Sequence, residues 1–412
     1  MIGIRYAIYS FLFTIIYAQP YDSPLLEKLI LQMDTHFHDV VSNPEKYKLQ
    51  IIYTQINRDK NNFPKFETHY YHYNPKEYFY PASTIKFPIA VLALEKINSI
   101  QKINQNTCLS ILDGPYDLDG VVKDSTSSSG FPTIAHYIHK LFVVSDNDAS
   151  NRLFEFLGRD YINKRLWDLG FVDARIRHRL NISLTDQQNC FTNSFLFYNN
   201  DELIYEQNSQ LANLNLDINY NNYILGKAFI NNEKKINVPF DFSAKNFMNI
   251  GEQHRFLQLI MFPEIQKNNT LLNLSDEDYQ YIYNKMSLLP RESLFPKYDD
   301  YNQYYDGYCK FLLFGDNKKK IPSSIRIFNK IGQAYGFSID NAYILDFENR
   351  VEFLLSVVIY TNQNETFNDD IYEYNDLSIP FLARFGKKIY EYELSRPKKN
   401  LPDLTRYNLG SW

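Results

Sequence analysis

The amino-acid sequence predicts a mixed α/β (α+β) fold. An antiparallel sheet built from both chain ends is expected to be flanked by helices, with an all-helical subdomain inserted between them. Two observations predict this arrangement. Alternating, β-forming segments occur near both ends of the 412-residue chain, and segments with helical periodicity fill most of the middle. We therefore expect a functional site where the sheet and the helical part meet.

Five strands are predicted from the alternation of apolar and polar residues and from richness in β-branched and aromatic residues. The first two are joined by the polar segment 58–62, which is typical of a hairpin loop. The last two are joined by a turn at 348–350. The predicted strands are 48–57, 66–73, 325–330, 338–346 and 351–361.

Eight helices are predicted from apolar residues that recur every three or four positions. Pro81 marks the turn before the second of them. The predicted helices are 23–41, 83–98, 132–143, 149–157, 161–169, 251–262, 276–288 and 377–394. The Asn- and Tyr-rich stretch 183–249 has weak periodicity and is interpreted as an insertion. The α/β part then covers about 19–100 and 322–412, the helical part covers about 101–321, and residues 19–412 form a single domain.

Residues 1–18 are expected to be a signal peptide. Arg5 supplies a positive charge, residues 6–17 are almost wholly apolar, and Ala18 provides a small residue at which cleavage would occur before Gln19. A retained N-terminal anchor is the alternative. Export to the periplasm or the medium makes disulfides feasible. The three cysteines allow either one bridge and a free thiol or three buried thiols.

The composition excludes several partner classes. A net charge of −5 provides no basic stripe for nucleic acid, and no later segment is apolar for long enough to be a membrane helix. His136 and His139 are one helical turn apart, but no third ligand accompanies them, so we expect no metal and no cofactor. The expected partner is a small-molecule or peptide substrate. The oligomeric state is left open.

The first motif that indicates chemistry is Ser83-Thr84-Ile85-Lys86. At the start of a helix, a spacing of three places Ser83 and Lys86 on one face, where the amine can activate the otherwise weakly nucleophilic hydroxyl. Ser-x-x-Lys also occurs at Ser99 and Ser395. Only Ser83 follows strands and a turn-forming proline and opens an amphipathic helix.

Two further motifs indicate chemistry only when they are considered together with the first. Ser145-Asp146-Asn147 lies between two helical segments, where Asp146 or Asn147 would by itself be read as a helix cap. Lys330-Ile331-Gly332 ends a strand, and by itself could be a simple strand end. Ser-x-x-Lys at a helix start, Ser-Asp-Asn between helices and Lys-x-Gly on a late strand occur here in the order found in one enzyme family.

In these motifs the chain resembles the class A β-lactamases and penicillin-binding proteins, over roughly 23–394 with the stretch 183–249 as the main gap. The resemblance implies an acyl-enzyme mechanism with a role for each motif residue. By this resemblance, Ser83 is the nucleophile and Lys86 is the base that accepts its proton. Ser145 donates a proton to the leaving nitrogen, Lys330 supports Ser145 by its charge, and Asn147 binds the substrate amide. The oxyanion hole is formed by the backbone amides of Ser83 and of Gln333, the residue after Gly332.

The chain departs from the family pattern at two positions. Ile331 stands where the family has Thr or Ser, so it cannot donate to a substrate carboxylate. Arg175-Ile-Arg177-His178-Arg-Leu-Asn181 resembles the family's deacylation loop, but Arg177 replaces the glutamate base, and an arginine stays protonated at ordinary pH. His178 beside it either titrates near neutrality or is an ordinary surface histidine.

The function expected from the sequence is that of an exported serine hydrolase. It would act through an acyl-enzyme on an amide or ester, either a β-lactam or a peptidoglycan-like peptide, and its deacylation of β-lactams would be inefficient. The alternative is a non-catalytic binding protein that has kept the fold. The substitutions at Ile331 and Arg177 favour the alternative, whereas the intact Ser83, Lys86 and Ser145 favour the enzyme.

Overall fold

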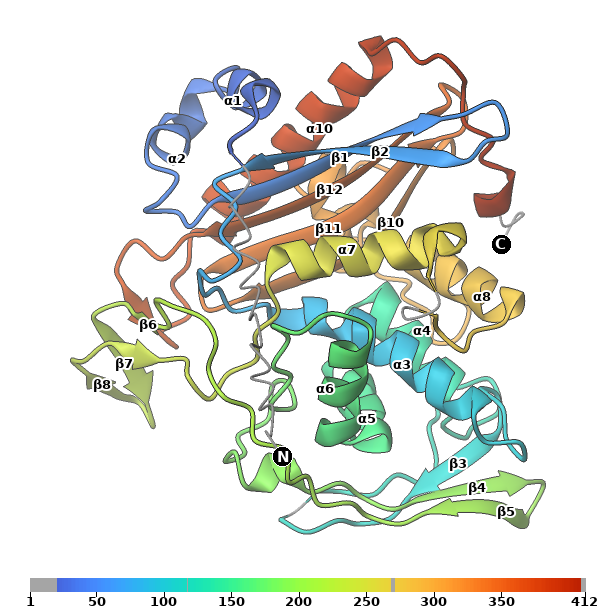
Figure 1. The fold of residues 1–412 in the computed structure, drawn as a ribbon. Coiled ribbons are helices and arrows are strands. Elements are labelled where there is room, and N and C mark those ends of the chain that lie inside the picture. The colour runs from blue at the N-terminus through green and yellow to red at the C-terminus, as the bar shows by residue number, and fades with distance from the viewer. Residues whose placement is uncertain (1–20, 117, 268–270, 409–412) are drawn as a thin grey trace, which may run out of the picture.

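The computed structural model describes residues 21–116, 118–267 and 271–408. Its centre is a five-stranded antiparallel sheet of order β10-β11-β12-β1-β2 (Figure 1). The strands are β1 (Gln50–Arg58), β2 (Pro64–Tyr71), β10 (Ile325–Ala334), β11 (Phe337–Asp346) and β12 (Val351–Tyr360). Because β1 pairs with β12, both chain ends build one sheet, and the predicted fold class is confirmed. The predicted signal peptide lies outside the described residues.

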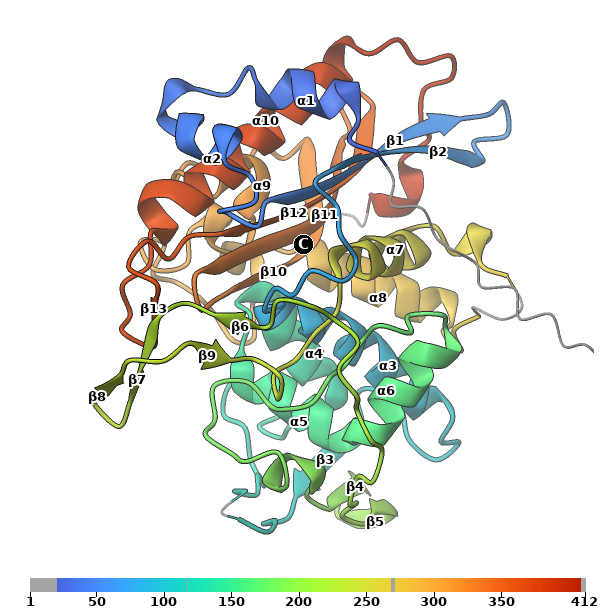
Figure 2. The same cartoon turned by 60° about the vertical axis from the view of Figure 1, so that its left-hand side comes forward.

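Helices cover both faces of this sheet (Figures 1 and 2). Every residue of β11 is buried, as expected for a strand that is covered on both sides. One face packs against α1 (Pro24–Ile30), α2 (His38–Ser42), α9 (Phe311–Phe314) and α10 (Ile379–Ser395), and the other against α7 (Ile250–Met261) and α8 (Asp276–Ser287). The first predicted helix is interrupted after α1, because Asp34 has an extended backbone.

The helical part lies below α7 in Figure 1 and carries the residues of the first two motifs. It contains α4 (Ile134–Val143), α5 (Asn147–Leu157) and α6 (Arg159–Asp168). It also contains α3 (Lys86–Asn98), which lies within the predicted α/β part 19–100 but packs against α4, α5 and α6. The prediction that this part is all-helical is wrong, because it also holds a sheet of β3 (Cys108–Ile111), β4 (Phe195–Asn199) and β5 (Glu202–Gln207). In β4 the alternate residues Phe195 and Phe197 are buried in the core.

The stretch 183–249 contains further short strands beyond β4 and β5. They are β6 (Ile224–Leu225), β7 (Ala228–Asn231), β8 (Lys234–Ile236) and β9 (Phe240–Asp241). β7 pairs in parallel with β13 (Thr366–Phe367), which follows the central sheet in sequence. Figure 2 shows this small sheet projecting at one side of the molecule, next to the junction of the two parts.

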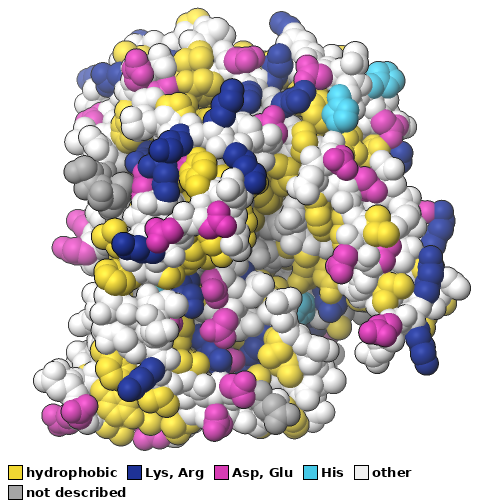
Figure 3. All heavy atoms as spheres, turned by 180° about the vertical axis from the view of Figure 1, so that it is seen from behind, with side chains coloured by type: hydrophobic (Ala, Val, Ile, Leu, Met, Phe, Trp, Pro, Cys, Tyr) yellow, Lys and Arg dark blue, Asp and Glu magenta, His cyan; other side chains and the backbone are white. Residues whose placement is uncertain are grey.

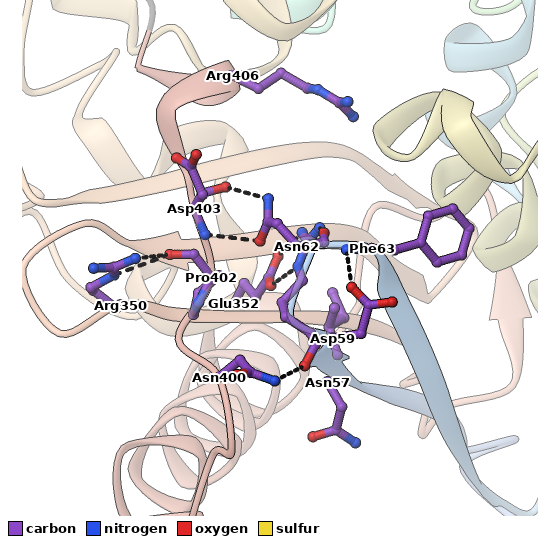
Figure 4. Close-up of polar contacts among 12 residues, drawn as sticks. Asn57, Asp59, Asn62, Phe63, Arg350, Glu352, Asn400, Pro402, Asp403 and Arg406 are labelled. Carbon is purple, nitrogen blue, oxygen red and sulfur yellow. Dashed lines mark hydrogen bonds and ion pairs between the residues drawn. The ribbon is translucent and has the colours of Figure 1, made fainter.

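The C-terminal segment returns to the tip of the β1–β2 hairpin (Figure 4). Asn62 and Asp403 exchange two hydrogen bonds there, and the Asn400 amide donates to the Arg58 carbonyl. Beneath this contact, the Arg58 guanidinium makes a bidentate ion pair with Glu352, with N–O distances of 2.6 and 2.7 Å. The pair is buried and joins β1 to β12.

The described residues bear on two expectations, the state of the cysteines and the absence of a membrane helix. All three cysteines are free, and only Cys309 is buried, so neither a bridge nor three buried thiols is found. Within 21–408, apart from the undescribed gaps, no helix has the length and apolarity needed to cross a bilayer.

Candidate functional site

Ser83 lies in a single 3₁₀ turn, Ala82–Ile85, that leads directly into α3. The turn begins with an unusual backbone: Ala82 has φ of +48°, a left-handed conformation that non-glycine residues rarely adopt. Within 81–86 only Ser83 is half-buried, while the other residues are buried. The turn therefore presents one hydroxyl outward from an otherwise closed segment.

Lys86 is fully buried behind this turn. Its Nζ donates to the Ser145 carbonyl at 2.6 Å and to Asn147 Oδ1 at 2.7 Å, and lies 3.4 Å from Ser145 Oγ. Burial, followed by the nearby charge of Lys330, holds the pKa of Lys86 well below its usual range. A neutral amine has two N–H groups, which these two acceptors satisfy, and its lone pair is then free to accept a proton.

Lys330 reaches the same point from β10. Its Nζ donates to Ser145 Oγ at 2.8 Å and to the Ile331 carbonyl at 3.0 Å. Burial lowers the pKa of Lys330 to about 8. Ser145, with φ of +59°, connects α4 to α5 in a left-handed conformation. Two lysines from distant parts of the chain thus converge on one hydroxyl.

The Ser145-Asp146-Asn147 motif provides both a helix cap and a site residue. Asp146 is the N-cap of α5, and its carboxylate accepts from the Ala149 amide at 2.8 Å. Asn147 is the first residue of α5, and its side chain accepts from Lys86 instead of capping the helix. The capping interpretation therefore holds for Asp146 and not for Asn147.

Gly332 allows β10 to approach the Ser83 turn. A Cβ atom at this position would lie 2.6 Å from the Pro81 carbonyl oxygen and 3.2 Å from the Ala82 Cβ. Such distances are shorter than packed atoms tolerate, so only glycine fits without a shift. The next residue, Gln333, is exposed and lines the cavity described below.

A cavity of about 920 Å³ opens at the junction of the sheet, the helical part and the inserted strands. Figure 3 shows the corresponding face of the molecule hollowed between its upper and lower parts. Ser83, Asn147 and Gln333 line this cavity from three separate segments. Its walls also carry aromatic rings, contributed by Tyr80, Phe240, Tyr335, Tyr372 and Tyr374.

Ile331 points away from this cavity. It is buried in the apolar cluster on the α10 face of the sheet, together with Leu312 and Phe381. Residues alternate between the two faces of a strand, so Lys330 faces the site while its neighbour faces the other core. An apolar side chain is suited to that place, and it offers no donor to a ligand.

The predicted deacylation loop is only partly present at the cavity. His178 and Asn181 line it, whereas Arg177 does not: its guanidinium donates to the Leu216 carbonyl, and the side chain is buried. His178 is not a surface histidine. Its ring stacks on Tyr80 with 6.3 Å between centroids, and burial lowers its pKa to about 4. It is therefore neutral at pH 7 and does not titrate near neutrality.

The tautomer of His178 is fixed by its neighbours. Its Nδ1 lies 2.5 Å from the Arg179 carbonyl, which can only accept, so Nδ1 carries the proton. Nε2 is buried and has no hydrogen-bond partner among the described residues. The ring thus holds a lone pair at the cavity wall.

Several residues at the site were missed from the sequence. Asn246 is fully buried, and its side chain accepts from the Arg177 and His178 amides and donates to the His178 carbonyl. Lys245 and Phe240, in the inserted stretch, line the cavity. No motif marks these positions. An Asn in so Asn-rich a chain carries no local signal, and the fold alone brings it to the loop.

Comparison with known proteins was made against families, curated proteins and solved structures. The model of the beta-lactamase enzyme family matches residues 35–204, a range that includes Ser83, Lys86, Ser145 and Asn147 and ends before Lys330. No curated protein matches the chain in sequence.

Solved structures of three beta-lactamases are similar to the chain in the path of the backbone. That from Desulfarculus baarsii is 13% identical, with 92% of this chain and 100% of that chain covered and a TM-score of 0.49. Those from Sphaerobacter thermophilus and Xanthomonas campestris are 11% and 10% identical, cover 90% and 89% of this chain and 98% of their own, and have TM-scores of 0.47 and 0.46. Identities this low carry nothing about activity. The family match over residues 35–204 confirms the resemblance to the beta-lactamase enzyme family that the motifs predict.

Proposed function

We propose that this protein is an exported serine hydrolase that acts through an acyl-enzyme on an amide or ester, with a β-lactam or a peptidoglycan-like peptide as the substrate class. One observation carries the proposal. The amine of Lys86 is buried and held by two acceptors, beside a serine turn that opens onto a large cavity, and Lys330 binds the hydroxyl of Ser145.

Acylation begins with the Ser83 hydroxyl. Its oxygen attacks the substrate carbonyl carbon while its proton passes to neutral Lys86. The tetrahedral oxyanion is stabilised by the backbone amides of Ser83 and Gln333, and preorganised donors of this kind contribute about 3–4 kcal/mol each. The intermediate collapses when the bond to the leaving group breaks. Ser145 gives its proton to the leaving nitrogen or oxygen and regains one from protonated Lys86, with which it is in contact.

Lys330 supports this proton transfer by charge. Its ammonium donates to Ser145 Oγ, so it stabilises negative charge on that oxygen as the proton leaves. Asn147 holds Lys86 in position and, at the cavity wall, has an amide N–H available for a substrate carbonyl. Ser83, Lys86, Ser145, Asn147 and Lys330 therefore each take part in the first half of the proposed reaction.

Deacylation is the weaker half of the proposed cycle. Arg177 points away from the cavity and cannot act as a base, so hydrolysis of a penicillin-derived acyl-enzyme is expected to be slow or absent. The unpartnered Nε2 of His178 is the base that the loop still offers, and its low basicity suits it poorly to the task. Rapid steady-state turnover of penicillins would contradict this expectation.

The test of the proposal is labelling by an acylating probe. A fluorescent fluorophosphonate or penicillin should label the wild-type protein and should not label Ser83→Ala. The control is Ser99→Ala, which removes the serine of another Ser-x-x-Lys outside the site and should label like the wild type. If no acylating probe labels the wild type, the alternative of a non-catalytic binding protein replaces the enzyme.

A further inference from the structure

Lys245 places an ammonium group at the wall of the cavity. It lies between β9 and α7, and its Nζ is 5.8 Å from the centroid of the Phe240 ring and 5.9 Å from that of Tyr335. Both rings also line the cavity. Tyr335 directly follows β10, the strand that carries Lys330 and Gly332, so the ammonium is held beside the end of the motif strand by two cation–π contacts.

This ammonium has no anionic partner among residues 21–408 that the structure describes. Burial alone lowers the pKa of Lys245, and no carboxylate offsets that effect. The other cation at the wall, Arg179, is bound to Glu155, and the acid Asp186 is bound to Arg159. Asp370 also lines the cavity but forms no ion pair with Lys245. A half-buried lysine without a counter-ion is a favourable place for an anion.

The strand motif offers no charged or hydroxyl group to a substrate carboxylate, although neutral donors such as Ser183, Tyr372 and Tyr374 line the cavity. Ile331 is buried in the opposite core and has no donor. Lys330 is 2% exposed, and its hydrogen bonds are used by Ser145 Oγ and its own strand. An anionic substrate that entered this cavity would therefore meet Lys245 as its accessible cation.

We infer that Lys245, a residue of the inserted stretch, is the residue that binds a carboxylate of the substrate. The inference rests on the proposed function and deepens it. The stretch 183–249 then contributes to specificity, because it brings an ammonium group without an ion-pair partner among the described residues to the wall of the cavity.

The experiment compares two esters of phenylacetylglycine, one with 3-hydroxybenzoic acid and one with 3-hydroxybenzamide. The two differ only in a carboxylate and its uncharged counterpart. The wild type is expected to cleave the acid with a kcat/KM about 10-fold higher than the amide, as one desolvated charge contact of about 1.4 kcal/mol would give. In Lys245→Met this ratio should fall close to one, and Lys245→Arg should restore part of it.

Lys235→Met is the matched control. Lys235 lies on β8 in the same inserted stretch, is exposed and does not line the cavity, so this variant should keep the wild-type ratio. If the wild type shows no preference for the acid, or if Lys245→Met keeps the preference, the carboxylate site is overturned while the hydrolase stands.

A binding measurement separates this inference from the proposed function. The non-cleavable 3-(phenylacetylglycylamino)benzoate and its benzamide counterpart are titrated calorimetrically into Ser83→Ala. The acid should bind about 10-fold more tightly, and Lys245→Met added to Ser83→Ala should remove the difference. Equal binding of the two ligands overturns the carboxylate site even if no probe ever acylates Ser83.

Discussion

Two lysines at the candidate site have different environments, and this difference suits the acid–base chemistry that we propose. Burial, followed by the charge of Lys330, lowers the pKa of Lys86 strongly, although Asp146 and Cys309 act in the opposite direction. Burial also lowers the pKa of Lys330, to about 8, and Cys309 and Asp340 partly offset that effect. In the mechanism that we propose, Lys86 therefore serves as the base and Lys330 as the charged support. Neighbouring groups with separated pKa values commonly mark such a division of roles.

Replacing the base should abolish most of the acylation. In Lys86→Met the hydroxyl of Ser83 loses its proton acceptor, so the second-order rate of labelling by a fluorophosphonate should fall by about 10²–10⁴-fold. Lys96→Met is the control, because Lys96 is also largely buried on α3 and bonds the Phe156 carbonyl outside the site. A Lys86→Met protein that is labelled at the wild-type rate would remove Lys86 from the mechanism.

The pH dependence of acylation should report Lys330. Its pKa of about 8 in the folded protein means that the ammonium is present below pH 8 and is lost as the pH rises through that value. The support for Ser145 is lost with it, so the acylation rate should decline on the alkaline side of about pH 8. Lys330→Met should react slowly at every pH and lack this alkaline decline in a stopped-flow labelling series.

At the scale of the element, the approach of β10 to the turn at Ala82–Ile85 determines whether the site can form. Gly332→Ala would place a methyl group 2.6 Å from the Pro81 carbonyl oxygen, and backbone must move to relieve it. We expect a loss of about 1–3 kcal/mol in the free energy of unfolding, as for overpacked cores, together with slower acylation.

The matched control for this substitution is Ile331→Val on the same strand. It trims a side chain on the opposite core face and leaves the spacing of β10 from the turn unchanged. Labelling should be unaffected while stability falls by about 1 kcal/mol. Urea unfolding and probe labelling of both variants measure the two effects separately. Gly332→Ala with normal labelling would show that the turn tolerates a Cβ.

The sequence predicts the long helices and strands of this fold because apolar residues repeat along each of them with the period of a helix or of a strand. Helix 83–98 and strands 48–57 and 338–346 lie within a few residues of α3, β1 and β11. The two-residue strands β6, β9 and β13 were missed. Their pairing depends on partners more than a hundred residues away in one case, Phe367 with Phe229, and this is a property of the folded chain.

The part of the candidate site that the sequence could indicate is the part that carries motifs. The three motifs name Ser83, Lys86, Ser145 and Lys330, and the structure places the amines of Lys86 and Lys330 within hydrogen-bonding distance of Ser145 Oγ. Lys245 and Asn246 have no such pattern around them. They reach the cavity because β7 pairs with β13 and so fixes the inserted stretch beside the sheet.

At the scale of the whole molecule, the pairing of β1 with β12 unites the two ends of the chain. The buried pair of Arg58 and Glu352, which also accepts from the Tyr343 hydroxyl, lies within this junction. Glu352→Gln would leave the guanidinium uncompensated, at a cost of about 3–5 kcal/mol in the free energy of unfolding. Urea denaturation followed by circular dichroism measures it.

The comparison for that variant is an exposed ion pair. Lys227→Gln removes the partner of Glu365 on the surface, and this should leave the unfolding midpoint unchanged, since solvent screens such pairs. If Glu352→Gln is as stable as Lys227→Gln, the buried pair does not stabilise the junction of the chain ends.

The contact between Lys330 and Ser145 joins two bodies: a lysine on the sheet touches a hydroxyl on the link between two helices. A small local displacement at this contact would abolish the acylation that we propose, while the core that the sheet and the helices share stays folded. On heating, the protein is thus expected to lose acylation at a lower temperature than that of its global unfolding. The rate of acylation would therefore report the contact between Lys330 and Ser145 more sensitively than a spectroscopic signal that averages over the chain.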